Sequence, residues 1–182
     1  MTPDRRDTAL SDRTTILRAR ARVLARPTEQ SPVAETVLDV LEFRLAQERY
    51  AVETRYVREV APLKELTPLP CTPSFVLGIV NVRGQIVPVF DLKKLFDLPD
   101  EGLTDLHRII IVRDHNLELG LLADLSLGVR SIPLSSLQPS LPTLTGIRGD
   151  YLKGVTAERL VVLDLASLLA DQRIIVNEDV EG

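Results

Sequence analysis

The chain has 182 residues, 45% of them hydrophobic and 26% charged, which is the composition of an ordinary soluble globular protein. A net charge of −4, 4% aromatic residues and no Trp are unlike a general nucleic-acid binder, which is usually basic and uses aromatic rings for base stacking. One Cys excludes an internal disulfide, and no apolar run is long enough to span a membrane or to form the core of a signal peptide. We therefore expect a cytoplasmic protein without membrane insertion.

Residues 1–36 predict an Arg-rich helix followed by a linker. Residues 14–26 have helix-forming composition, with apolar side chains on one side and arginines at every fourth position on the other. Residues 1–30 hold seven Arg against four acidic residues, a balance of +3, so the rest of the chain carries −7. Three interpretations stay open for this helix: it is solvated, it docks through its apolar side, or it binds a membrane surface or nucleic acid.

From residue 37 the hydrophobic period changes to two. Leu41, Phe43 and Leu45 alternate with polar residues, which predicts a half-buried strand, and a return strand begins at Tyr50. Val57 and Val60 then flank two charged residues, and this spacing predicts a short helical or irregular piece.

The next elements are a helical turn and a hairpin. Residues 73–78 predict one helical turn that ends at Gly78. Residues 76–92 contain two β-rich apolar runs around an Arg-Gly-Gln turn, where Gly84 supplies the positive φ that such turns commonly need. Pro88, inside the second run, suggests an edge strand or a bulge. Asn81 and Arg83 beside the turn add nothing to a core, so they point to recognition.

The second half of the chain predicts further strands and an internal repeat. Residues 89–96 resemble residues 162–169: in each, a strand leads into an Asp suited to capping a helix, Asp91 or Asp164. This similarity suggests two β-rich lobes, each closed by a short helix. The expected strands are 108–113, 117–125, 128–134, 151–155 and 159–163, with a long polar connection at 135–146.

No group of residues has catalytic or metal-binding spacing. Cys71 lies in a proline-flanked loop far from either His, and His107 and His115 flank a strand as expected surface residues. Asp91 and Asp164 are better explained as helix caps than as paired acids. We expect no enzymatic activity, no catalytic residue, no metal site and no cofactor.

Residues 78–92 match the pattern G-x-x-N-x-R-G-x-x-x-P-x-x-D-L throughout, and in this the chain resembles the CheW family of chemotaxis scaffold proteins. The resemblance covers roughly residues 38–172. It implies an all-β fold with short helices, built as two SH3-like five-stranded β-barrel lobes packed side by side. The expected organisation is residues 1–36 as the N-terminal amphipathic helix and linker, 37–174 as the CheW-like domain and 175–182 as an acidic tail.

The resemblance also implies a function. Members couple the histidine kinase CheA, through its regulatory domain, to the cytoplasmic tips of chemoreceptors, and no nucleic-acid partner is expected. The alternatives are a CheW-like scaffold for a non-chemotaxis kinase pathway, and a nucleic-acid or membrane-surface regulator that acts through the Arg-rich helix. The residues expected at the receptor contact are Arg83, Asn81, Gly84, Glu59, Val57, Gly78 and Val129.

Simpler interpretations of these residues remain open. Arg83 and Asn81 could satisfy turn carbonyls, and Glu59 could be a solvated acid or could hold Arg83 in place. Val57, Gly78 and Val129 could be ordinary core or turn residues.

Overall fold

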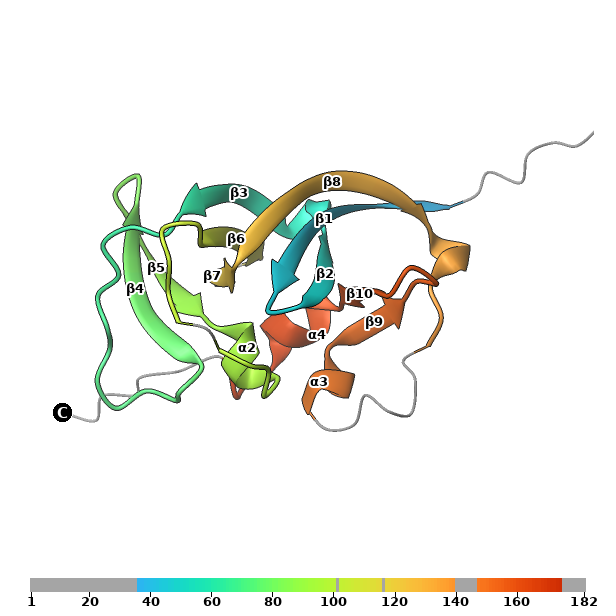
Figure 1. Cartoon of the computed structure of the whole chain (residues 1–182). Coiled ribbons are helices and arrows are strands. Elements are labelled where there is room, and N and C mark those ends of the chain that lie inside the picture. The colour runs from blue at the N-terminus through green and yellow to red at the C-terminus, as the bar shows by residue number, and fades with distance from the viewer. Residues whose placement is uncertain (1–35, 101, 116, 140–146, 175–182) are drawn as a thin grey trace, which may run out of the picture. The chain divides into compact units, whose positions relative to one another are not determined.

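The computed structural model describes residues 36–100, 102–115, 117–139 and 147–174, which form two five-stranded sheets (Figure 1). The predicted N-terminal helix, and with it the regulator alternative, lies outside these residues, as does the predicted acidic tail. The strands are β1 (Val37–Leu45), β2 (Glu48–Glu53), β3 (Val57–Pro62), β4 (Val76–Val82), β5 (Gln85–Phe90), β6 (Arg108–Asp114), β7 (Leu117–Ala123), β8 (Leu125–Pro133), β9 (Leu152–Val155) and β10 (Leu160–Leu163).

The two sheets have matching topologies. Lobe A has the strand order β8-β1-β2-β10-β9, and lobe B has the order β3-β6-β7-β5-β4. Each sheet is antiparallel except for one parallel pair, β10 with β2 in lobe A and β5 with β7 in lobe B. The predicted all-β fold with two five-stranded lobes is confirmed.

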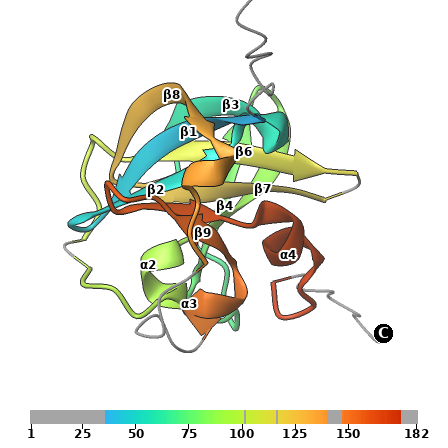
Figure 2. The same cartoon turned by 90° about the vertical axis from the view of Figure 1, so that its right-hand side faces the viewer.

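The internal repeat corresponds to a shared strand-cap-helix unit. The carboxylate of Asp91 accepts a hydrogen bond of 2.9 Å from the Lys93 N–H and caps α2 (Leu92–Leu95). The carboxylate of Asp164 accepts one of 3.2 Å from the Ser167 N–H and caps α4 (Leu165–Ala170). Both views place these helices, with α3 (Ile147–Asp150), on one side of β1 and β8 (Figure 2). Two 3₁₀ turns, η1 (Thr54–Tyr56) and η2 (Leu134–Ser136), complete the described elements.

One apolar core is shared by both lobes. Phe43 and Tyr50 of lobe A lie in the same cluster as Ile110, Leu119 and Leu121 of lobe B, and all five are fully buried. Each lobe also has a smaller cluster of its own. The lobes are therefore joined by hydrophobic burial as well as by the chain.

The prediction of a helical or irregular piece at Val57–Val60 was wrong, because these residues belong to the edge strand β3. The pairing of β3 with β6 shifts register between Val57 and Glu59, so Arg58 is the extra residue of a bulge. The bulge interrupts the alternation of buried and exposed residues that marks a strand. Val57 and Val60, three residues apart, instead match the spacing of apolar residues in a helix.

The prediction for residues 73–78 was partly wrong. A turn is present, since the Val76 N–H donates to the Pro73 carbonyl at 2.9 Å, but β4 starts at Val76. Gly78 does not end a helix; it has φ +147° at a register shift in the β4–β5 ladder.

Two further predictions were corrected. Pro88 lies in β5, which is an internal strand, but the ladder from β5 to β7 covers only Val89 and Phe90. Pro88 therefore precedes the pairing in which its missing N–H would be needed. His107 is 4% exposed and not a surface residue, whereas the His115 side chain is 92% exposed as expected.

A buried tyrosine anchors the last described residues. The Tyr151 hydroxyl donates to the Asp171 carboxylate at 2.6 Å and accepts from the Arg173 guanidinium at 3.1 Å. Burial first, and then the hydrogen bond to Asp171, raise the pKa of Tyr151 to about 12. Hydrogen bonds from Arg173 and Tyr151 hold the pKa of Asp171 well below its ordinary value.

We expect Asp164→Ala to lower the free energy of unfolding by about 1 kcal/mol, because the first turn of α4 loses its side-chain cap. Asp164→Asn keeps an acceptor at the same position and should lose much less. Urea unfolding followed by circular dichroism measures both variants. Equal losses for the two variants would contradict a capping role.

The raised pKa of Tyr151 predicts a loss of stability at high pH. An unfolded Tyr releases its proton near pH 10, whereas the folded one keeps it to about pH 12. The stabilisation is complete below pH 10 and disappears as the pH rises toward 12. Urea midpoints measured across this range should fall less steeply for Tyr151→Phe than for the wild type, and identical slopes would refute the assignment.

Candidate functional site

The β4–β5 hairpin presents Arg83 at a tight turn. Arg83 and Gly84 both have positive φ, 51° and 86°, as in the two-residue turns that match the twist of a hairpin. The Asn81 side-chain oxygen accepts a hydrogen bond of 2.8 Å from the Gly84 N–H. Asn81 and Gly84 therefore build the turn, and Arg83 is the side chain that the turn displays.

The guanidinium of Arg83 is held from a neighbouring strand. Its Nη2 atom lies 3.1 Å from Oε2 of Glu59 on β3. The Arg83 side chain is 79% exposed and that of Glu59 is 19% exposed. Of the two interpretations of Glu59, the one in which it holds Arg83 matches this geometry.

The bulge in β3 aims two adjacent side chains at the hairpin. Arg58 donates through Nη1 to the Glu118 carboxylate at 2.6 Å and also to the side chain of Gln85, the first residue of β5. Glu59 meanwhile pairs with Arg83 at the tip. Bulges commonly re-aim side chains in this way, and here the result is a hairpin fastened to β3 at two points.

A hollow of about 280 Å³ lies between the two edge strands of lobe B, and Arg83 is one of its lining residues. Its lining combines charged groups of Glu59, Lys64 and Arg83 with apolar side chains of both strands. Val60 is 38% exposed. Ile86, which is the partner of Asn81 in the β4–β5 ladder, is 62% exposed. The hollow thus has charged as well as apolar groups in its lining, and exposed apolar side chains lie on the strands of the same lobe.

The remaining predicted residues occupy different environments. Val57 is half-buried against the shared core, and Val129 on β8 is 66% exposed. Gly78 is buried, and a Cβ there would lie 2.1 Å from the Thr67 carbonyl oxygen. Gly78 therefore admits a segment of its own chain rather than an approaching partner.

Sequence reasoning missed Arg58, Val60 and Ile86 as members of this surface. The sequence interpretation took residues 57–60 as helical or irregular, and without a strand there is no alternation of side chains from which to infer that Arg58 and Val60 point outward. Ile86 carries an available signal, since alternation in a strand places Ile86 and Val87 on opposite faces.

Two kinds of feature are absent from the described residues. Within them, no group of three or more His, Cys, Asp or Glu is arranged to hold a metal ion. In the same part of the chain, no helix combines the length and apolarity that crossing a membrane requires.

The described residues form a two-lobed all-β domain that displays a charged hairpin tip, an arrangement suited to binding another protein. A model of the CheW-like domain matches residues 39–173, and the chain belongs to this family.

The sequence similarity to known CheW proteins extends over most of this chain. It is 32% identical over 146 residues to chemotaxis protein CheW of Thermotoga maritima, covering 78% of this chain and 93% of that one. It is 28% identical over 149 residues to chemotaxis protein CheW of Treponema pallidum, covering 78% and 88%. The crystal structure of the scaffolding protein TtCheW from Thermoanaerobacter tengcongensis superposes with a TM-score of 0.64 and 33% identity, covering 70% of this chain and 89% of that one.

The two glycines of the hairpin should respond differently to Ala. Gly78→Ala should cost about 3 kcal/mol of unfolding free energy, because its Cβ meets backbone atoms and cannot be accommodated by a rotamer change. Gly84→Ala meets no atom within 4 Å and should cost about 1 kcal/mol, from the positive φ alone. Chemical denaturation measures both, and a Gly78→Ala variant as stable as wild type would disprove the close packing.

Proposed function

We propose that this chain is the adaptor that couples chemoreceptors to the histidine kinase CheA, with Arg83 and Glu59 at the centre of its receptor contact. The observation that carries the proposal is an arginine 79% exposed to solvent yet fixed by a carboxylate 3.1 Å away. An exposed side chain that is already ordered loses little conformational entropy when it binds.

The ion pair leaves Arg83 available to a second partner. An exposed salt bridge contributes only about 0–1 kcal/mol, so sharing the guanidinium between Glu59 and a receptor group has a small cost. Guanidinium carries five N–H donors, and one carboxylate does not use them all. An acidic or carbonyl-rich tip of a receptor's helical hairpin fits this chemistry.

Apolar groups would complete the receptor contact. Val57 and Val129 come from different lobes, and Val60 and Ile86 add exposed apolar surface beside Arg83. An amphipathic helix can place its apolar residues against such a surface. Gly78 contributes indirectly in this proposal, by letting Thr67 pair with Ile79 of β4.

The kinase would occupy a separate face, where its regulatory domain meets one end of a lobe. Each contact alone can be weak, because an array that engages many copies at once gains strength from multivalency.

The test is Arg83→Glu, measured as binding of a soluble receptor-hairpin fragment by calorimetry or pull-down. We expect at least tenfold weaker binding, since a charge-assisted bidentate contact contributes about 1.5–3 kcal/mol. Arg83→Lys should restore the charge but only part of the affinity, because an ammonium lacks the planar fork of donors.

Arg159→Glu is the matched control. Arg159 is also exposed at a hairpin turn with positive φ, 61°, but it lies between β9 and β10 of lobe A. The Arg159→Glu protein should bind the receptor fragment with the affinity of the wild type. A folded Arg83→Glu protein with wild-type affinity would refute the role of Arg83.

A further inference from the structure

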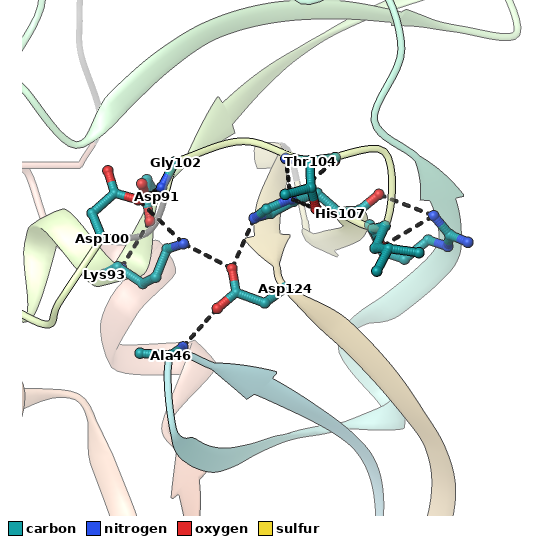
Figure 3. A network of polar contacts seen from close by, with 10 residues as sticks. Ala46, Asp91, Lys93, Asp100, Gly102, Thr104, His107 and Asp124 are labelled. Atoms are coloured by element: carbon teal, nitrogen blue, oxygen red, sulfur yellow. Dashed lines mark hydrogen bonds and ion pairs between the residues drawn. The ribbon is translucent and has the colours of Figure 1, made fainter.

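The chain passes from lobe B to lobe A through a single residue, Asp124, which lies between β7 and β8 (Figure 3). The other crossing in the described residues is η1, between β2 and β3. Because a single residue joins strands of the two sheets, its backbone torsion angles help to set the angle between the sheets, within the freedom that η1 and the shared core leave.

Asp124 is bound to lobe A through the β1–β2 turn. Its N–H donates to the Arg44 carbonyl at 3.0 Å. Its Oδ2 atom accepts from the Ala46 N–H at 2.6 Å. Both groups of Asp124, backbone and side chain, are therefore fixed on this lobe.

The other carboxylate oxygen of Asp124 is bound from lobe B. Its Oδ1 atom lies 2.7 Å from Nζ of Lys93 in α2 and 2.9 Å from Nε2 of His107, which precedes β6. The Lys93 and His107 side chains are only 2% and 5% exposed. One carboxylate thus joins groups of both lobes at the crossing, and Figure 3 shows the three side chains converging.

Contacts with Thr104 hold the ring of His107. The Thr104 N–H donates to Nδ1 at 2.8 Å, and the hydroxyl and carbonyl oxygens of Thr104 each lie 3.0 Å from the same nitrogen. Nε2 is buried and makes no hydrogen bond within the described residues, so its 2.9 Å approach to Oδ1 of Asp124 is a close polar contact. Thr104 therefore orients the ring beside Asp124, as a second polar contact commonly does for histidine.

Lys93 and Asp124 are both charged. Burial alone would lower the pKa of Lys93, but the hydrogen bond to Asp124 and the nearby carboxylates of Asp124, Asp91 and Asp100 hold it above its ordinary value. Burial alone would raise the pKa of Asp124, but Lys93 and the Ala46 N–H hold it below the ordinary value. Such an ion pair requires a defined geometry, unlike apolar burial, which is non-directional.

We propose that Lys93, Asp124 and His107 are positioning residues that lock the lobe crossing, so that the receptor-binding groups of lobes A and B face one partner together. We call these three residues the crossing cluster. The proposal rests on the proposed function for its consequence, though not for its geometry.

The contact residues show why the crossing matters. Glu59 and Arg83 belong to lobe B, whereas Val129 lies on β8 of lobe A, five residues after Asp124. A receptor hairpin can meet all of them at once only if the angle between the lobes is fixed. Freedom at Asp124 would lower the fraction of molecules in the binding orientation, and the apparent affinity falls by that fraction.

The test variant is Lys93→Met with Asp124→Asn. It removes both charges of the buried pair, and Asp91 keeps its hydrogen bond from the backbone N–H of residue 93, so the chain should still fold. Asn keeps an acceptor for the Ala46 N–H. The matched control is Arg49→Met with Glu42→Gln, which removes an ion pair of 3.1 Å between β1 and β2, within lobe A. Urea unfolding establishes that both proteins are folded.

The direct readout is the distance between the lobes. Cys71, the only Cys in the sequence, is exposed and precedes β4 of lobe B. Ala157→Cys adds a second site in the exposed turn between β9 and β10 of lobe A. Spin labels at positions 71 and 157 allow the distance to be measured by pulsed electron–electron double resonance. Wild type and control should each give one narrow distance distribution, and the test variant should give a broader one. An unchanged distribution in the folded test variant overturns the proposal.

The second readout is affinity for the receptor-hairpin fragment, where we expect about a tenfold loss for the test variant and none for the control. A broadened distance distribution with unchanged affinity also overturns the positioning role. If the wild type itself does not bind the fragment, the proposed function fails, and the distance measurement alone decides whether the crossing cluster locks the lobes.

Discussion

Apolar side chains from both sheets meet in one buried cluster, and the arrangement of the molecule depends on this shared burial. Phe43 and Tyr50 of lobe A pack in the same core as Ile110 and Leu121 of lobe B, so neither lobe covers its own inner face completely. Truncating one such side chain to Ala costs about 2–5 kcal/mol. The shared core keeps the lobes together, and the polar contacts at the surface and at the crossing then determine what they present.

Two kinds of charged contact act on this framework in different ways. The Arg83–Glu59 pair is exposed and contributes little to stability, which leaves Arg83 available to a partner. The Lys93–Asp124 pair is largely withdrawn from solvent, so breaking it would leave a charge without compensation. The same chemistry therefore serves recognition at the hairpin tip and, in our proposal, orientation at the lobe crossing.

Much of the fold could be predicted because its signals are local. The turn at Gly84 and the caps at Asp91 and Asp164 each depend on residues within a few positions in sequence, and the repeat of the strand-cap-helix unit indicated two lobes. The failures are non-local. Gly78 is small because of Thr67, eleven residues away, and His107 is buried beside Asp124, although it looks like a loop residue in sequence. The ion pair between Glu59 and Arg83 was one of two interpretations until the strand β3 was known.

The strand order has a consequence for how the domain is assembled during synthesis. Lobe B uses one continuous segment, β3 to β7, whereas lobe A takes β1 and β2 from before that segment and β8 to β10 from after it. As the polypeptide leaves the ribosome, lobe B can close on itself while Val40 and Ala51 of the β1–β2 hairpin still lack their packing partners in β8 and β10. Lobe A must then wait for contacts of high sequence separation, which form slowly. Until β8 to β10 have been synthesised, the chain exposes these apolar side chains, which is the kind of surface that chaperones bind.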